Sequence, residues 1–214
     1  MTDATLLRRC LLRQVECAID AAIDVVQIRE RDLEGRALAA LVAEAVAMTR
    51  GTRTRVVVND RLDVAVASGA DGVHLRADSI PIAAARAMAP SSLVIGLSVH
   101  SEAEAVAAAL QVDYLIAGTV WPTSSKSGDH PCIGPQGLAA IVRAARVPVL
   151  AIGGVTVDRV TEVAAAGASG IAAIGLFLDA EAKSRPVVGG CLAVPLGELA
   201  RTMRGRFDTV RSAS

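Results

Sequence analysis

The sequence predicts an α/β fold: a (β/α)8 TIM barrel with its first strand truncated or missing, in a single domain spanning residues 1–214. Short apolar runs rich in β-branched residues alternate with helical segments seven times along the chain. The pattern Gly-Ala-x-Gly-apolar occurs in both halves, at residues 69–73 and 167–171, as repeated βα units would produce. No GxGxxG motif follows the first of these runs, so a dinucleotide-binding fold has no specific support.

Seven strands and eight helices are expected. The first five residues carry no apolar run and should give at most a stub of a strand. A proline near the first turn favours a helix beginning at residue 80, and Ser101 with Glu104 has the spacing of a capping box. The expected strands are residues 24–30, 56–58, 72–75, 93–98, 114–118, 148–152 and 170–174. The other expected helices are residues 6–23, 34–49, 62–67, 101–110, 135–145, 156–166 and 196–210.

Composition limits the partners and the compartment. The formal net charge is +0, so no broad basic field favours nucleic acid as a partner. No apolar run approaches the roughly 20 residues that span a bilayer, and no signal peptide opens the sequence, so we expect a cytoplasmic protein with no membrane partner. Cys10, Cys17, Cys132 and Cys191 lack metal or CxxC spacing. They are expected to be reduced thiols, with Cys10 and Cys17 in the core.

Polar residues follow most of the expected strands, where a barrel gathers its active site. Arginine suits bidentate phosphate contacts, aspartate suits Mg²⁺, and a glycine turn can bind phosphate through its backbone. Convergence of these groups from separate strands predicts a phosphate and metal site. The candidates are Gln27, Arg29, Arg31, Asn59, Asp60, Asp78, Ser98 and His100 after the earlier strands, then Thr123, Ser125, Lys126, Gly153, Gly154 and Gly175.

Several of these residues have a purely structural alternative. The Asn59-Asp60 pair could cap the helix that begins near Leu62. The charged run at residues 29–31 could be a solvated surface, and the glycine pair at residues 153–154 could simply turn the chain. His74 lies inside an apolar strand, and we expect it to be a core histidine rather than a catalytic one.

Seven segments resemble the thiamine phosphate synthase and TenI family in order and spacing, over roughly residues 24–174. They are QIRER, VNDR, GADGVHL, IGLSVH, DYLIAGTVWPTSSK, GPQGL and PVLAIGGV. The resemblance implies a (β/α)8 barrel. It also implies a transferase that joins a hydroxymethylpyrimidine pyrophosphate to a thiazole phosphate with Mg²⁺, releasing pyrophosphate. The partners implied are small phosphorylated substrates and, in a homo-oligomer, further copies of the chain.

The resemblance also implies residue roles. Gln27, Arg29 and Arg31 would bind the pyrophosphate end of the pyrimidine substrate, and Asn59 would touch that substrate. Asp60 would hold Mg²⁺. Asp78 lies one residue before the position of the family's second acid, and we expect it to replace that acid as a metal ligand. Ser98 would lie near the reacting groups. Phosphate groups would be bound by Thr123, Ser125 and Lys126, with Lys126 on the leaving pyrophosphate. The thiazole phosphate would bind Gly154 and the turn of Ile174 and Gly175. Arg29, Ser98 and Lys126 are the implied catalytic residues.

Three departures keep two alternatives open. The family's second metal aspartate is Ser79 here, its usual lysine after QxRE is Arg31, and its first strand is cut short. The first two favour a TenI-like thiazole tautomerase. The retained Asp60 and PTSSK loop favour the synthase, as does Thr119 where the Bacillus-type tautomerase has a histidine. The other alternative is a non-catalytic regulatory barrel that binds thiazole phosphate or thiamine phosphate.

Overall fold

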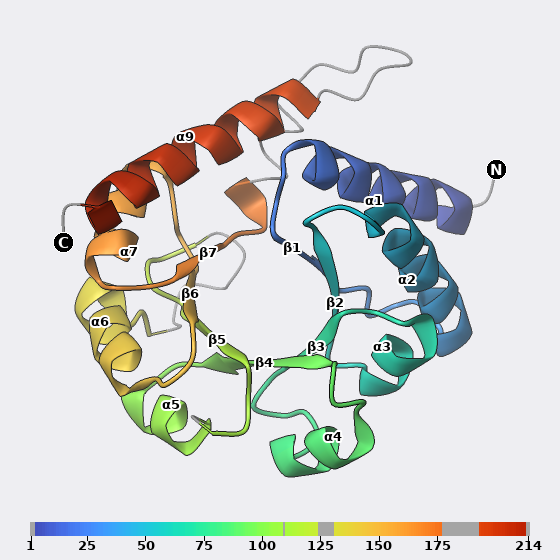
Figure 1. Cartoon of the computed structure of the whole chain (residues 1–214), viewed down its shortest axis with the longest axis horizontal. Coiled ribbons are helices and arrows are strands. Elements are labelled where there is room, and N and C mark those ends of the chain that lie inside the picture. The colour runs from blue at the N-terminus through green and yellow to red at the C-terminus, as the bar shows by residue number, and fades with distance from the viewer. Residues whose placement is uncertain (1–2, 109, 124–130, 177–192, 213–214) are drawn as a thin grey trace.

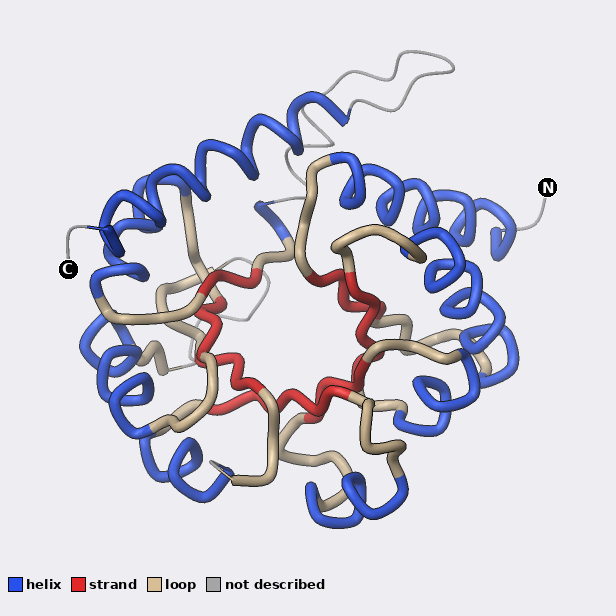
Figure 2. Tube along the Cα trace, viewed as in Figure 1, coloured by secondary structure: helices blue, strands red, loops and turns tan. Residues whose placement is uncertain are grey.

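Seven parallel strands form one sheet in the order β1-β2-β3-β4-β5-β6-β7. The computed structural model describes residues 3–108, 110–123, 131–176 and 193–212. In this part of the chain the sheet curls into a barrel with the helices outside it (Figures 1 and 2). All seven predicted strands are confirmed: β1 Val25–Ile28, β2 Arg55–Asn59, β3 Gly72–Leu75, β4 Val94–Val99, β5 Tyr114–Ala117, β6 Val149–Ile152 and β7 Gly170–Ala172.

Helices connect the strands, as right-handed βαβ units require. Between strands lie α2 Gly35–Thr49, α3 Leu62–Ser68, α4 Ile82–Met88, α5 Glu102–Ala108, α6 Gly134–Ala144 and the pair η1 Val157–Arg159 with α7 Val160–Ala165. Two longer helices, α1 Asp3–Asp20 and α9 Ala193–Ser212, precede β1 and follow β7. The capping-box spacing is functional in part, because the Glu104 N–H donates to Ser101 Oγ at 3.2 Å.

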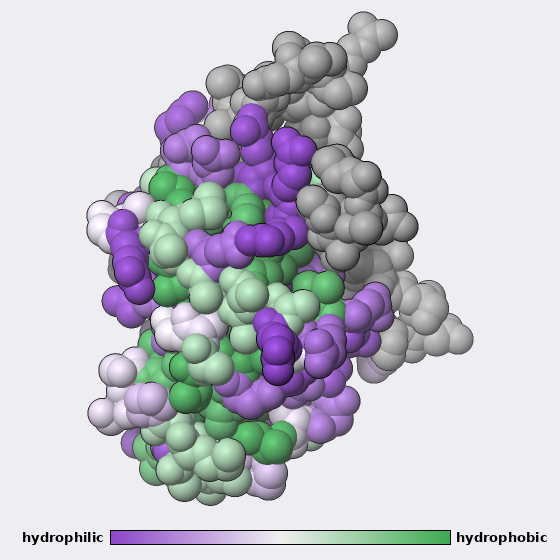
Figure 3. Space-filling model, turned by 90° about the vertical axis from the view of Figure 1, so that its right-hand side faces the viewer, coloured by the Kyte–Doolittle hydropathy of each residue, from purple (hydrophilic) through white to green (hydrophobic). Residues whose placement is uncertain are grey.

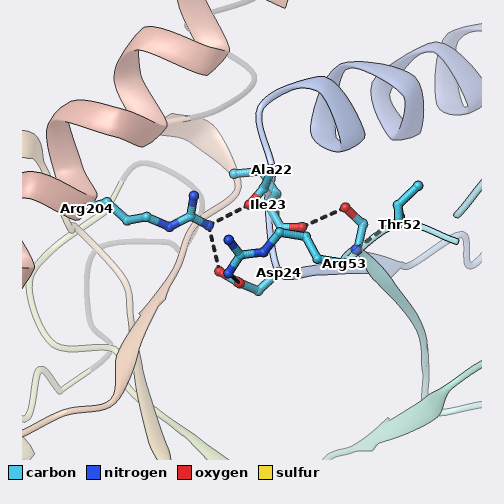
Figure 4. A network of polar contacts seen from close by, with 7 residues as sticks. Ala22, Ile23, Asp24, Thr52, Arg53 and Arg204 are labelled. Atoms are coloured by element: carbon cyan, nitrogen blue, oxygen red, sulfur yellow. Dashed lines mark hydrogen bonds and ion pairs between the residues drawn. The ribbon is translucent and has the colours of Figure 1, made fainter.

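The barrel has no eighth strand in its described residues. Residues from Asp3 onward are helical, so the predicted loss of the first strand is confirmed, and no pairing joins β7 to β1. Helix α9 runs past this gap and packs on α1 (Figure 1). Figure 4 shows how α9 holds the start of β1: Arg204 donates to Ala22 O and to Asp24 Oδ2 at 2.8 Å, and Arg53 also pairs with Asp24.

The core lies between the sheet and the helices. Its largest fully buried side chains include Leu75, Ile95 and Leu115 from the strands and Leu38 and Leu138 from the helices. Alanine and valine fill most of the rest, since helices packed closely on a parallel sheet need small side chains.

The repeated glycine pattern marks equivalent turns. Gly69 and Gly167 follow α3 and α7 with φ of 69° and 83°, a left-handed conformation that glycine adopts without strain. At the first turn the Asp71 carboxylate also accepts the Val56 N–H at 2.8 Å. Asp113 repeats this contact before β5 by accepting the Ile95 N–H at 2.7 Å.

The cysteine prediction is partly wrong. Cys17 is buried as expected, but it is disulfide-bonded rather than reduced. Cys10 is a free thiol and is exposed, because it lies on the solvent side of α1. Cys132 is exposed, and Cys191 lies outside the described residues.

The outer surface mixes residue types. Figure 3 shows hydrophobic and hydrophilic residues interspersed on the side of the molecule that carries α2 and α3. Among the described residues, none of the helices is both long and apolar enough to cross a bilayer. A homo-oligomer stays a prediction.

Candidate active site

The inner face of the barrel carries four polar side chains near the C-terminal ends of its strands. Register places Asn59 of β2 beside His74 of β3, and His74 beside Gly96 of β4. Paired residues face the same way and residues two apart in a strand do too, so Ser98 joins this face. Gln27 of β1 donates from Nε2 to Asn59 Oδ1 at 3.1 Å. The structure therefore brings Gln27, Asn59 and Ser98 to one interior, as predicted.

Asp60 leaves the end of β2 with a positive φ of 64°. Its carboxylate accepts hydrogen bonds from Ser79 Oγ and, at 3.0 Å, from Arg76 Nη2. The bond from Ser79, helped by Arg76, lowers the pKa of Asp60 although burial opposes it. Helix α3 instead has Arg61 at its N-cap and no side-chain cap, so the structural alternative for Asp60 is excluded.

Asp78 reaches the same guanidinium. Its carboxylate lies 3.2 Å from Arg76 Nη2, although the Asp78 side chain is 71% exposed. Arg76 therefore stands between the two predicted metal ligands. The Arg76 main-chain N–H also donates to Ser79 Oγ at 2.8 Å, which fixes the turn after β3. Its buried Nε has no hydrogen-bond partner among the described residues.

Two further arginines lie close to this cluster. Burial, followed by repulsion from Arg31 and Arg76, lowers the pKa of Arg29. The charge of Arg31 also helps to lower the pKa of Asp60. Three guanidinium groups thus face two carboxylates at one rim of the barrel, which favours binding of a multiply charged anion. Arg29 and Arg31 are themselves exposed, so their positive charge is available to a ligand.

A glycine turn follows β6. Gly153 and Gly154 have φ of 96° and 62°, and a Cβ on Gly154 would lie 2.6 Å from Pro122 O and 2.7 Å from Trp121 Cβ. Glycine is required here because the loop after β5 packs directly on the turn. Arg159 donates to Gly154 O at 2.8 Å and stacks over the Trp121 ring at 5.0 Å from its centroid. These contacts hold the turn in one conformation.

The remaining predicted residues lie either at the same end of the barrel or outside the described residues. Thr123 lies in the loop after β5. Ile174 is 51% exposed just after β7, and a Cβ added to Gly175 would meet no described atom within 4 Å. Ser125 and Lys126 lie outside the described residues.

His100 lies beyond β4, and its ring Nδ1 contacts Gly118 O. Glu104 accepts the His100 N–H at 2.7 Å. These contacts tie the exposed imidazole to the loop after β5 rather than leaving it free in the site.

Sequence reasoning missed two site residues. Arg76 was not among the predicted site residues, although a cation that directly follows β3, as Asp60 follows β2, was a usable signal. Tyr114 was read only as part of a strand. Its hydroxyl contacts His74, which is 2% exposed as expected of a core histidine.

Comparisons with known proteins agree with this arrangement. Residues 1–177 match the family described as thiamine monophosphate synthase. The chain belongs to this family. It is 45% identical over 152 residues to a thiamine-phosphate synthase of Methanoregula boonei, covering 71% of this chain and 70% of that one. It is 37% identical over 190 residues to the Methanospirillum hungatei enzyme of the same name, covering 86% and 92%.

Solved structures support membership of the thiamine monophosphate synthase family. Thiamine phosphate pyrophosphorylase from Pyrococcus furiosus superposes with a TM-score of 0.77 at 32% identity, covering 93% of this chain and 90% of that one. A 3-hexulose-6-phosphate synthase, at 20% identity and a TM-score of 0.64, shares the fold alone. The fold prediction is therefore confirmed.

Proposed function

We propose that this protein is a thiamine phosphate synthase, a transferase that joins hydroxymethylpyrimidine pyrophosphate to thiazole phosphate. The names of its relatives support this assignment. The observation that carries it is the cluster of Arg29, Arg31 and Arg76 around Asp60, at the rim where the glycine turn also lies. Pyrophosphate carries more negative charge and more acceptor oxygens than a single phosphate. It therefore matches three guanidinium groups better.

The proposed contacts divide between two substrates. Arg29 and Arg31, with Lys126 from the loop after β5, bind the pyrophosphate. Asn59, held by Gln27 at 3.1 Å, presents its amide to the pyrimidine. The thiazole phosphate binds the backbone of the turn after β6 and the end of β7. The residues that complete these contacts are Thr123, Ser125, Gly154, Ile174 and Gly175, and Ser98 lies near the reacting groups.

The reaction breaks one bond and forms another. The C–O bond between the pyrimidine methylene and pyrophosphate breaks, and the electron pair leaves with pyrophosphate. The methylene cation is stabilised by the amine of its ring until the thiazole nitrogen supplies an electron pair and forms the new C–N bond. The largest electrostatic demand is the charge on the departing pyrophosphate, which the arginines and Lys126 stabilise.

Magnesium fits the donor atoms at the rim. Asp60 and Asp78 offer hard carboxylate oxygens in contact with one cation, the Arg76 guanidinium, and the Ser79 hydroxyl beside Asp60 offers a third oxygen. Mg²⁺ needs only one or two carboxylates besides waters and substrate phosphates. Asp60 and Asp78 would hold the ion, and it would supply positive charge to the leaving group. Both carboxylates already pair with Arg76, so the ion and this guanidinium compete for them.

The decisive assay is formation of thiamine phosphate by the purified protein with both substrates and Mg²⁺. We expect Asp60→Ala to abolish the product and Glu162→Ala, which removes an exposed carboxylate on α7, to leave it unchanged. No product, together with conversion of the thiazole phosphate to its aromatic tautomer, would favour the TenI-like function. Binding of the phosphates without any turnover would favour the regulatory one.

Calorimetry tests the metal separately. Pyrophosphate binding should require Mg²⁺, be lost in Asp60→Ala and be reduced in Asp78→Ala, because Asp78 is the more exposed acid. Ser79→Asp should tighten Mg²⁺ binding by adding a carboxylate at a position already in contact with Asp60. An affinity for pyrophosphate that is the same with and without Mg²⁺ would contradict the synthase assignment.

A further inference from the structure

A hydrogen-bonded chain of three side chains, with a buried histidine at its centre, crosses three neighbouring strands beneath the proposed active site. His74 of β3 contacts Ser98 Oγ through Nε2 at 2.8 Å and the Tyr114 hydroxyl through Nδ1 at 3.1 Å. His74 is 2% exposed, so bulk water does not compete for either nitrogen. These two hydrogen bonds therefore link Tyr114, at the start of β5 in the barrel interior, to Ser98, near the C-terminal end of β4 where substrate is proposed to bind.

The backbone is shaped to admit this chain. A Cβ on Gly96 would lie 2.1 Å from Cζ and 2.5 Å from the hydroxyl oxygen of Tyr114, so only glycine leaves room for the tyrosine ring. The ring then lies beside the imidazole, with centroids 5.6 Å apart and planes tilted by 31°. Gly96 is the inward-facing β4 residue between Val94 and Ser98, and it pairs directly with both His74 and Tyr114.

The two contacts select one tautomer of the ring. Burial lowers the pKa of His74 to about 4, so the imidazole is neutral near pH 7 and carries a single proton. Burial also raises the pKa of Tyr114, which keeps its hydroxyl protonated. If the proton were on Nδ1, the Tyr114 hydroxyl hydrogen would have no hydrogen-bonding acceptor among the described residues, and a largely buried donor without a partner is costly.

With the proton on Nε2, every group is satisfied. Tyr114 donates to Nδ1, and Nε2–H donates to Ser98 Oγ. The Ser98 oxygen then accepts a hydrogen bond from His74 Nε2–H. The hydroxyl hydrogen of Ser98 remains free to turn towards the open end of the barrel. In the other tautomer Ser98 would donate to the ring and have no hydrogen for a substrate.

We infer that His74 and Tyr114 are positioning residues, which fix the Ser98 hydroxyl as a hydrogen-bond donor to the bound substrate. The claim that Ser98 donates to substrate rests on the proposed synthase function. The claim that His74 is protonated at Nε2 does not. Neither residue touches substrate, so both act only through Ser98. Without the Tyr114 hydroxyl, nothing holds the His74 proton on Nε2, so the Nδ1–H tautomer becomes populated. This lowers the fraction of molecules in which the Ser98 hydroxyl can donate to substrate. The chemical step slows, whereas substrate binding, carried by the arginines, changes little.

The first test needs no substrate. Nitrogen-15 NMR of the histidine rings should show His74 protonated at Nε2 in the parent protein and a shift towards the Nδ1–H form in Tyr114→Phe, which keeps the aromatic ring. His100, which is exposed, serves as an internal reference in the same spectra. An Nδ1–H tautomer in the parent protein, or a His74 signal unmoved by Tyr114→Phe, would overturn the inference even if the protein is a synthase.

The second test is a double-mutant cycle on the rate of thiamine phosphate formation. Tyr114→Phe should lower kcat about three- to tenfold with little change in KM, the usual effect of losing one hydrogen bond. In a Ser98→Ala background the same substitution should have no further effect, because its only route is through Ser98. An equal loss in both backgrounds would show a general structural role and refute the inference. Absence of product in the parent protein would refute the proposed function, while the tautomer measured by NMR would still stand.

Discussion

The buried imidazole of His74 should make the folded protein sensitive to mild acid. Its pKa is lowered by burial from 6.5 to about 4 in the folded protein. In the unfolded chain the ring is solvated and regains its ordinary value. Between these two values the unfolded chain binds a proton that the folded protein does not, so the free energy of unfolding decreases as the pH falls.

The size of the effect follows from the shift. The stability linked to neutral His74 is fully present above about pH 6.5 and is lost progressively down to about pH 4. The loss should reach about 2 kcal/mol near pH 5 and about 3 kcal/mol near pH 4. Carboxylates with lowered pKa, such as Asp60, add their own losses only below about pH 4. Glu30, whose pKa burial raises, contributes in the opposite direction. His74→Gln is therefore the control that assigns the loss between pH 7 and pH 5 to the histidine.

Urea unfolding monitored by circular dichroism at these two pH values measures the difference. We expect the parent protein to lose about 2 kcal/mol between them and His74→Gln to lose much less, whatever its absolute stability. His100→Gln, which removes an exposed ring, should keep the loss of the parent. The same decrease in the parent and in His74→Gln would show that other groups cause it, and would refute the assignment of a buried neutral imidazole.

Three further predictions concern the phosphate sites and the gap in the sheet. Gly154→Ala should lower the thermal midpoint and weaken thiazole phosphate binding because its Cβ would clash with Trp121, whereas Gly205→Ala, with open space around it, should do neither. Lys126→Ala should weaken pyrophosphate binding at least about tenfold by calorimetry; unchanged affinity would remove it from the site. Arg204→Ala should cost up to about 1 kcal/mol in urea unfolding, and less once Asp24 is replaced by Asn, because only the bond to Ala22 O is then left to lose.

The regular part of the fold could be predicted because it depends on local pattern. Each strand is a short run of β-branched residues, and each is followed by a helix of the length that a parallel sheet requires. The rim residues followed from the same reasoning, since parallel strands deliver their C-terminal side chains to one end. Asn59 and Ser98 were placed correctly on this basis, two strands apart in the barrel.

What could not be predicted depends on distances across the chain. The contact between His74 and Tyr114 joins residues 40 positions apart and follows from strand register, which no single segment specifies. The guanidinium of Arg76 lies between Asp60 and Asp78 because the turn after β3 folds back on Ser79. Cys10 was misplaced because the buried face of α1 is set by its packing against α2 and α9, outside the helix itself.

The missing strand divides the site into two unequal parts. Asn59, His74 and Ser98 lie on strands that have a paired neighbour on both sides. The arginines that follow β1 and the turn after β7 lie instead at the two open edges of the described sheet. Their positions depend on one strand neighbour each and, for β1, on the bond from Arg204 to Asp24. A change at these edges should affect the two proposed phosphate-binding ends first, while the hydrogen-bonded chain beneath Ser98 keeps its geometry. Changes at the gap should therefore be felt as weaker substrate binding rather than as a slower chemical step.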